Sequence, residues 1–212
     1  MRAGLVSING SPAQSAAEKA NPACDEVMVR GCVVDLREHI YVMLHKPQGV
    51  ISASRDPKAA TVIDLLPQHL RRRELFPVGR LDKDTTGLLL ITDDGALAHA
   101  LLSPRRHVPK IYVASLAAPA TESDIAAFSA GLHLPSDEIC KPADLTPLEN
   151  NQARIVLHEG KYHQVKRMFA AVGNEVLALH REAMGSLYLD EGLNPGECRE
   201  LTEDEIKKLK GL

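Results

Sequence analysis

The sequence lacks the spacings and runs that would place it in several large classes of protein. Its four cysteines include no C-x-x-C and no pair at metal-ligand spacing, so the sequence predicts neither a metal site nor a redox motif. Free thiols in a reducing cytoplasm are the simpler interpretation. No apolar run approaches the roughly 20 residues that span a bilayer, and the first residues are too polar for a signal peptide. We therefore predict a soluble, cytoplasmic protein.

Charge excludes little by itself. The net charge of -3 gives no overall preference for nucleic acid, so any basic surface must be local. Basic residues do gather at positions 71–73, 105–107, 161–167 and 180–181. Such clusters are often only solvated faces, so they permit an RNA partner without requiring one.

The first 35 residues form a separate segment. "LVSINGSPAQS" alternates like a strand and contains Asn9-Gly10, a strong tight-turn pair. "DEVMVRGCVV" gives a second short strand pattern with Gly31 at a turn. Together they predict a small β element with too little apolar material for a core of its own.

The rest of the chain mixes strands with fewer helices. Expected strands include "YVMLH", "GLLLIT", "KIYVASL" and "ARIVLHEG"; expected helices include "DDGALAHALLS", ended by Pro104, "TESDIAAFSAGL", "HQVKRMFAAVG" and "LTEDEIKKLK". A short helix is also expected over "VIDLL", capped by Thr61. Because the helices do not alternate regularly with the strands, we predict an α+β fold with a largely antiparallel, mixed sheet.

The stretch "GRLDKDTTGLLLITDDG" (79–95) holds four aspartates and allows three interpretations. Read as D-x-D-x-T-G-x5-D, it approaches a calcium-binding EF-hand loop. Pro77 and Gly79 argue against the helix that must enter such a loop, and "LLLIT" is too apolar for its second half. Calcium is therefore disfavoured.

The other two interpretations divide the aspartates. Asp84 can bond its own turn together with Thr85 and Thr86, and Asp93 or Asp94 can cap the next helix. Asp82 differs because it lies on a loop beside an expected buried strand, which is a good platform for chemistry. The residues alone leave Asp82 open between a structural and a catalytic role.

The same stretch resembles the central motif of the RsuA-like family of ribosomal RNA pseudouridine synthases, G-R-L-D-x-x-T-x-G-L-L. "SPRRHVPKIYVASL" (103–116) and "EGKYHQVKRMFAAVGNEVLALHREAMGSLYLD" (159–190) resemble two further family motifs, and "MLHKPQGVISA" resembles the start of its catalytic domain. The likeness spans roughly residues 2–208.

The resemblance implies a cofactor-free isomerisation of uridine to pseudouridine in RNA, with no metal. It implies that Asp82 is the catalytic aspartate, that Tyr112 packs on the uracil, and that Lys166 pairs with Asp82 and keeps it ionised. Arg80 would help to extrude the target nucleotide. The residues expected to contact RNA are Arg80, Arg105, Arg106, Lys110, Lys161, His163, Gln164 and Arg167.

The resemblance also implies a domain plan and a partner. Residues 1–38 would be part of an S4-like RNA-binding domain whose N-terminal helices are not matched, and residues 39–212 the pseudouridine-synthase catalytic domain. We expect a monomer whose partner is ribosomal RNA, in particular small-subunit (16S) RNA in a partly assembled particle. Large-subunit (23S) RNA and a non-catalytic role in ribosome assembly stay open as alternatives.

Overall fold

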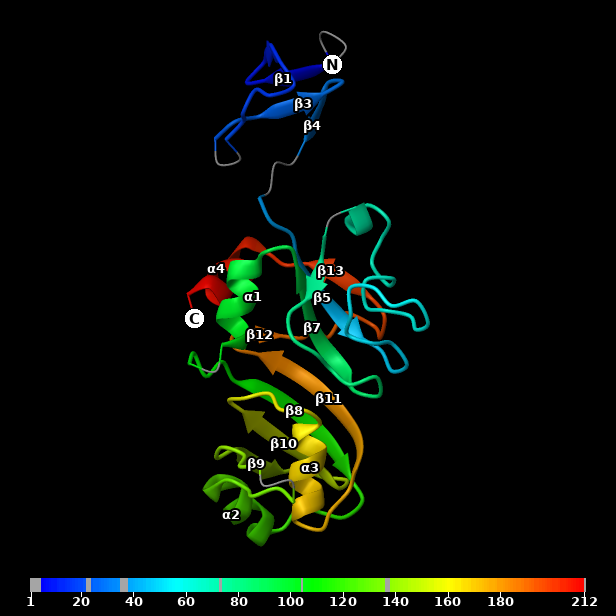
Figure 1. Cartoon of the computed structure of the whole chain (residues 1–212), viewed down its shortest axis with the longest axis vertical. Coiled ribbons are helices and arrows are strands. Elements are labelled where there is room, and N and C mark those ends of the chain that lie inside the picture. The colour runs from blue at the N-terminus through cyan, green and yellow to red at the C-terminus, as the bar shows by residue number, and fades with distance from the viewer. Residues whose placement is uncertain are drawn as a thin grey trace. The chain divides into compact units, whose positions relative to one another are not determined.

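The computed structural model describes residues 5–21, 24–34, 38–72, 74–103, 105–135 and 138–211 (Figure 1). The chain divides into two compact units, residues 1–40 and 41–212. The sequence prediction puts the boundary between residues 38 and 39. None of the described helices has the length and apolar character needed to cross a membrane.

In the smaller unit, the described residues form an antiparallel sheet in the order β2-β1-β3-β4. The strands are β1 (Val6–Ile8), β2 (Ser11–Pro12), β3 (Val27–Val29) and β4 (Cys32–Val34). Asn9 and Gly10 join β1 to β2 with φ of 51° and 80°, the left-handed pair that a tight hairpin requires. Both turns that the sequence predicts are present, whereas the S4-like identity of the unit stays a prediction.

The described part of the larger unit contains a nine-stranded sheet with the path β13-β5-β7-β11-β8-β10-β9; β12 pairs with β11, and β6 with β7. The strands are β5 (Tyr41–Lys46), β6 (Phe76–Pro77), β7 (Thr86–Thr92), β8 (Lys110–Leu116), β9 (Asp144–Pro147), β10 (Gln152–Leu157), β11 (Val176–Met184), β12 (Leu187–Tyr188) and β13 (Cys198–Glu200). Among these pairs, β7 with β11 is parallel and the others are antiparallel. The predicted mixed, largely antiparallel α+β architecture is confirmed.

Helices flank the sheet at both ends (Figure 1). They are α1 (Gly95–Leu102), α2 (Glu122–Ala130), α3 (Gln164–Ala171) and α4 (Glu203–Lys210), with a 3-10 turn at Leu70–Arg72. Leu101 of α1 and Leu209 of α4 are buried in one core cluster with Leu88 and Leu90 of β7. At the other end, Phe128 of α2 contacts Phe169 of α3, and both rings are fully buried.

The helix starts follow the predicted caps. The Asp94 carboxylate accepts a 2.9 Å bond from the Leu97 amide at the start of α1, and Thr121 and Thr202 open α2 and α4 with capping boxes. The prediction of a helix over "VIDLL" is wrong, since residues 62–65 form turns. The Asp64 carboxylate accepts a bond from the backbone amide of Thr61 in this turn. Pro104 lies outside the described residues.

A close approach of backbones joins β7 to β11. Gly87 has φ of 106°, and a Cβ added there would collide with the backbone of Arg181. Only glycine allows these two strands to approach so closely. The parallel pair matters because β7 continues directly from the loop that carries Asp82.

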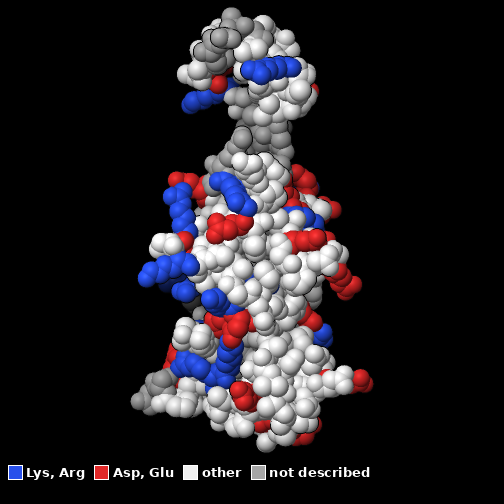
Figure 2. Space-filling model, turned by 90° about the vertical axis from the view of Figure 1, so that its right-hand side faces the viewer, with Lys and Arg blue, Asp and Glu red and all other residues white. Residues whose placement is uncertain are grey.

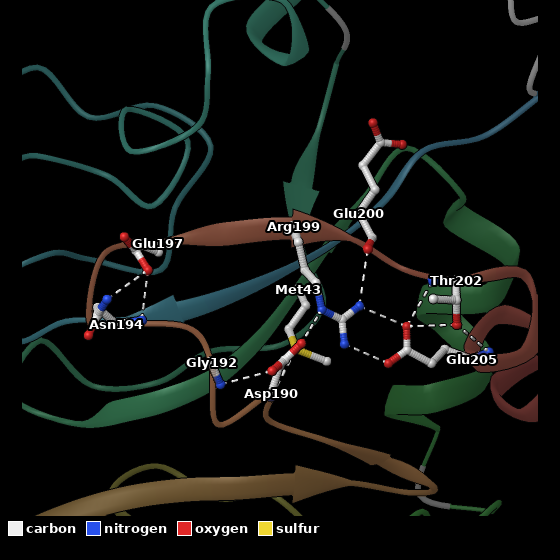
Figure 3. A network of polar contacts seen from close by, with 9 residues as sticks. All are labelled: Met43, Asp190, Gly192, Asn194, Glu197, Arg199, Glu200, Thr202 and Glu205. Carbon is white, nitrogen blue, oxygen red and sulfur yellow. Dashed lines mark hydrogen bonds and ion pairs between the residues drawn. The ribbon is translucent and has the colours of Figure 1, made fainter.

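A network of charges fixes the C-terminal helix (Figure 3). The Arg199 guanidinium bonds Asp190 at 2.6 Å and both carboxylate oxygens of Glu205 at 2.8 and 2.9 Å. The paired Arg199, followed by bonds from Thr202, lowers the pKa of Glu205 to about 2 against an opposing effect of burial. Bidentate geometry of this kind is the strong form of an arginine–carboxylate pair.

Candidate active site

A cavity of about 630 Å³ opens in the larger unit, at the loop before β7. Strands β8 and β11 and the segment between β10 and α3 form its other walls. The predicted site residues that line it are Arg80, Asp82, Lys110, Tyr112, Lys161, His163 and Gln164. Segments that are far apart in sequence therefore meet around Asp82, as the resemblance implies.

Asp82 lies between the side chains of His163 and Lys166. Its side chain is 28% exposed; the Nε2 of His163 is 3.4 Å from one carboxylate oxygen and the Nζ of Lys166 is 3.7 Å from the other. Both partners come from the start of α3. A half-buried carboxylate with a flanking imidazole and ammonium can serve as a nucleophile or a base.

Lys166 contacts a second aspartate more closely. Its Nζ is 2.7 Å from each carboxylate oxygen of Asp84, which is nearer than Asp82. The bond from Lys166 lowers the pKa of Asp84. The sequence predicts that Asp84 shapes its own turn; in the structure both of its oxygens also accept from Lys166. The ammonium thus lies between two carboxylates.

Lys46 holds the Asp82 loop from inside the protein. It ends β5, has no exposed surface, and donates to the backbone carbonyls of Asp82 at 2.9 Å and Thr85 at 2.8 Å, with longer contacts to Pro47 and Lys83. Burial lowers its pKa to about 8. Its position is not among the predicted site residues, although a lysine ending a buried strand pattern just before Pro47 is a sign that could have marked it.

Ser52 holds the same loop from a third segment. Its hydroxyl donates to the Leu81 carbonyl at 2.9 Å and accepts from the Leu81 amide at 3.0 Å. The Gly49 amide donates to the carbonyl of Lys83 at 2.8 Å. Because backbone groups on both sides of Asp82 are bonded, the loop presents its carboxylate in a fixed position.

The segment entering α3 presents Tyr162 and His163. His163 has a left-handed φ of 48°, and its ring stacks on that of Tyr162 with centroids 3.8 Å apart and an interplanar angle of 18°. Gln164 is buried. Its side-chain Nε2 donates to the Glu159 carboxylate at 2.6 Å, and its Oε1 accepts from the backbone amide of Lys161 at 2.9 Å. In the structure Gln164 therefore shapes the turn that carries His163, and the RNA contact predicted for it stays a prediction.

The inner wall of the cavity carries Tyr112 and two cations. Lys110, Tyr112 and Arg181 are each at most 8% exposed. Burial, then the nearby Arg181, lowers the pKa of Lys110, and its Nζ bonds the Val108 carbonyl at 3.3 Å. The phosphate contact predicted for Lys110 stays a prediction; the structure places this residue in the wall of the cavity and largely buried.

Arg181 is a second residue that the sequence reasoning did not place in the site. Its Nε donates to the Leu88 carbonyl at 2.8 Å, and its Nη2 meets no hydrogen-bond acceptor among the residues that the structure describes. The sequence shows that Arg181 belongs to the basic pair at residues 180–181, but it does not show that Arg181 is buried.

The remaining predicted cations differ in their surroundings. Lys161 and Arg167 both pair with Glu138, at 3.1 and 2.7 Å. Arg80, Arg105 and Arg106 are exposed, and of these Arg80 lines the cavity. Figure 2 shows basic and acidic side chains interspersed over one face of the larger unit. No cluster of metal-ligating side chains occurs in the described ranges of the chain.

Known proteins match this chain over most of its length. The family model for RNA pseudouridylate synthase matches residues 40–171. The chain is 48% identical over 213 residues to the uncharacterized RNA pseudouridine synthase YtzG of Bacillus subtilis, covering 99% of this chain and 89% of the relative. It is 42% identical over 207 residues to ribosomal small subunit pseudouridine synthase A of Escherichia coli K12, covering 97% and 89%.

A solved structure shares the fold. A crystal structure of a pseudouridylate synthase superposes with a TM-score of 0.77 at 40% identity, covering 97% of this chain and 88% of that chain. Sequence and fold thus agree over both the cavity and the strands that build it.

Proposed function

Because the chain belongs to the RNA pseudouridylate synthase family, we propose that its cavity receives one uridine of small-subunit (16S) ribosomal RNA and isomerises it to pseudouridine. The small-subunit target is supported by the name of the Escherichia coli relative, at 42% identity. The position of Asp82 in the cavity, between His163 and Lys166, is the observation on which the proposal depends.

The chemistry requires no outside reactant. The N1–C1′ bond of the uridine breaks, the base rotates, and a C5–C1′ bond forms; the proton leaves C5 and a proton is gained at N1. We assign Asp82 as the nucleophile: its carboxylate bonds the nucleotide as the N1–C1′ bond breaks and is released as the C5–C1′ bond forms, dividing one difficult step into two. Tyr112, in the inner wall, packs on the uracil and receives the C5 proton.

Substrate entry needs the target base outside its helix. Flipping a nucleotide costs a few kcal/mol, which the enzyme must offset. Arg80 is exposed, lines the cavity and lies two residues before Asp82, so it is placed to fill the vacated position. Arg105 and Arg106, exposed on the turn after α1, are assigned to phosphate contacts.

The test is a map of pseudouridine in ribosomal RNA. The protein is incubated with free 16S RNA and with precursor small-subunit particles, and pseudouridine is located by carbodiimide-dependent primer stops. We expect one new stop with the wild type and none with Asp82→Asn. Asp204→Asn, which changes an 85% exposed carboxylate on α4, is the matched control and should behave as wild type.

Each other outcome has a defined meaning. A stop that arises only in 23S RNA would transfer the activity to the large subunit. No stop in either RNA with folded wild-type protein would refute the assigned reaction. Asp82→Asn should still bind RNA, because phosphate contacts dominate affinity; if that variant retained the whole cellular function, a non-catalytic assembly factor would be the better description.

A further inference from the structure

Tyr162 is an aromatic residue that is mostly exposed to solvent. Its residue is 74% exposed, more than any other large apolar or aromatic residue that the structure describes. The chain holds four tyrosines, three phenylalanines and no tryptophan, so an exposed ring is a rare feature here. Tyr162 also lines the cavity that contains Asp82. An exposed aromatic ring beside a reactive carboxylate suggests contact with a ligand.

The Tyr162 ring is already packed on one face, and the backbone that carries it is bonded. It stacks on the His163 imidazole at 3.8 Å, and its backbone carbonyl accepts a 3.1 Å bond from Arg167. Arg167 is in turn paired with Glu138 at 2.7 Å. A ring that is already packed on one face loses less conformational entropy than a free one when a second ring stacks on it.

One face of the Tyr162 ring is covered by His163, and the exposure of the residue leaves the opposite face open to solvent. A planar nucleobase fits such a face, since unpaired bases in RNA are commonly held by stacking on aromatic side chains. The imidazole of the stack lies 3.4 Å from Asp82. A base on Tyr162 would therefore neighbour the one at the reactive carboxylate.

We propose that Tyr162 is the stacking platform for the base of a nucleotide that flanks the target uridine. This inference rests on the proposed function and deepens it, because it makes Tyr162 a positioning residue for the RNA strand. Stacking tolerates every base, so Tyr162 supplies affinity and strand placement rather than base identity.

The experiment uses the full chain and an RNA fragment containing the mapped uridine. Binding and single-turnover pseudouridine formation are measured for wild type, Tyr162→Ala, Tyr162→Phe and Tyr188→Ala. Tyr188→Ala is the matched control, since Tyr188 is 61% exposed on β12 and is not part of the cavity lining. We expect Tyr162→Ala to weaken binding by roughly 5- to 150-fold, the range for one lost base stack. Tyr162→Phe and Tyr188→Ala should stay within about twofold of wild type.

A second substitution, in the RNA, identifies the partner. Fragments lacking the base on the 5′ or the 3′ side of the target are bound by wild type and by Tyr162→Ala. If Tyr162 is the platform, wild type binds one of these fragments more weakly than the intact RNA, whereas Tyr162→Ala binds the two equally. This is the coupling expected of two groups in contact. Absence of coupling at both positions would overturn the platform.

The division between binding and rate separates the remaining possibilities. If Tyr162→Ala binds normally but reacts slowly at saturating RNA, Tyr162 acts only by orienting His163 and the inference is wrong. If wild type forms no pseudouridine in any ribosomal RNA, the proposed function is wrong. If wild type turns over normally and Tyr162→Ala binds and reacts as well as wild type, only the stacking role of Tyr162 is wrong.

Discussion

The buried ammonium of Lys46 donates a 2.9 Å hydrogen bond to the backbone carbonyl of Asp82. The same group bonds the carbonyl of Thr85 at 2.8 Å. A side chain from β5 thus fixes both ends of the short segment that carries the proposed catalytic carboxylate. It acts on the backbone, so it positions Asp82 without contacting the cavity itself.

Removing Lys46 should destabilise the fold and the site together. In Lys46→Met the buried carbonyls lose their donor, at about 1–3 kcal/mol for each acceptor left unsatisfied, and we expect a loss of about 3 kcal/mol. Urea denaturation followed by circular dichroism measures this loss. Lys207→Met on α4, whose side chain is 72% exposed, should change stability by less than about 0.5 kcal/mol. Equal stability of the two variants would contradict the assigned role.

Lys46 should also lose its proton at a lower pH than an ordinary lysine. Burial lowers its pKa from 10.5 to about 8, while the unfolded chain keeps its proton to about 10.5. Between these values the unfolded state binds more protons, so the contribution of Lys46 to the free energy of unfolding rises with pH over this window. Carbon-13 NMR of the lysine ε-carbon, assigned with Lys46→Arg, should show a transition near pH 8. A transition near 10.5 would contradict the burial argument.

Lys166 should contribute more to the reaction rate than Asp84, the carboxylate nearest to it. Lys166→Met removes the ammonium beside Asp82; a charge-assisted contact of about 1.5–3 kcal/mol corresponds to roughly 10- to 150-fold in the saturating single-turnover rate. Asp84→Asn keeps that ammonium and removes its competing partner, so we expect a rate within about threefold of wild type. Comparable losses in both variants would show that Asp84 is also required.

The C-terminal network should weaken in acid. Arg199, followed by Thr202, holds the folded-state pKa of Glu205 near 2, below its ordinary value of 4.5. The resulting stability is fully present above pH 4.5 and is lost as the pH falls from 4.5 towards 2, where Glu205 takes up a proton. Wild type and Glu205→Gln should therefore differ in thermal midpoint at pH 7 and converge near pH 2. A constant difference across this range would count against the network.

Gly87 should tolerate no side chain. Gly87→Ala forces a Cβ into the backbone of Arg181 at a positive φ, and we expect a loss above about 2 kcal/mol. Gly95→Ala in α1 is the control, because no described atom lies within 4 Å of its added Cβ. That change should leave stability unchanged or raise it by up to about 1 kcal/mol. Thermal unfolding of both variants measures the contrast.

Local patterns predicted most of the architecture. The spacing in "HQVKRMFAAVG" places Val165, Met168 and Phe169 on the buried face of α3, and Gly173 follows it with a φ of 81°. The capping boxes at Thr121 and Thr202 are present as predicted. The helix over "VIDLL" failed because Asp64 bonds the Thr61 backbone in a turn, a choice that spacing alone does not decide.

The sequence by itself determined the family, through three motif blocks that the comparisons confirm, and it singled out Asp82 as the aspartate to test. The tertiary structure decided which groups surround that aspartate. Lys46 and Arg181 become part of the site only because strands distant in sequence meet there, and Lys166 lies closer to Asp84 than to Asp82 for the same reason. Periodicity and capping act over a few residues, whereas burial and charge pairing depend on approaches across the whole fold.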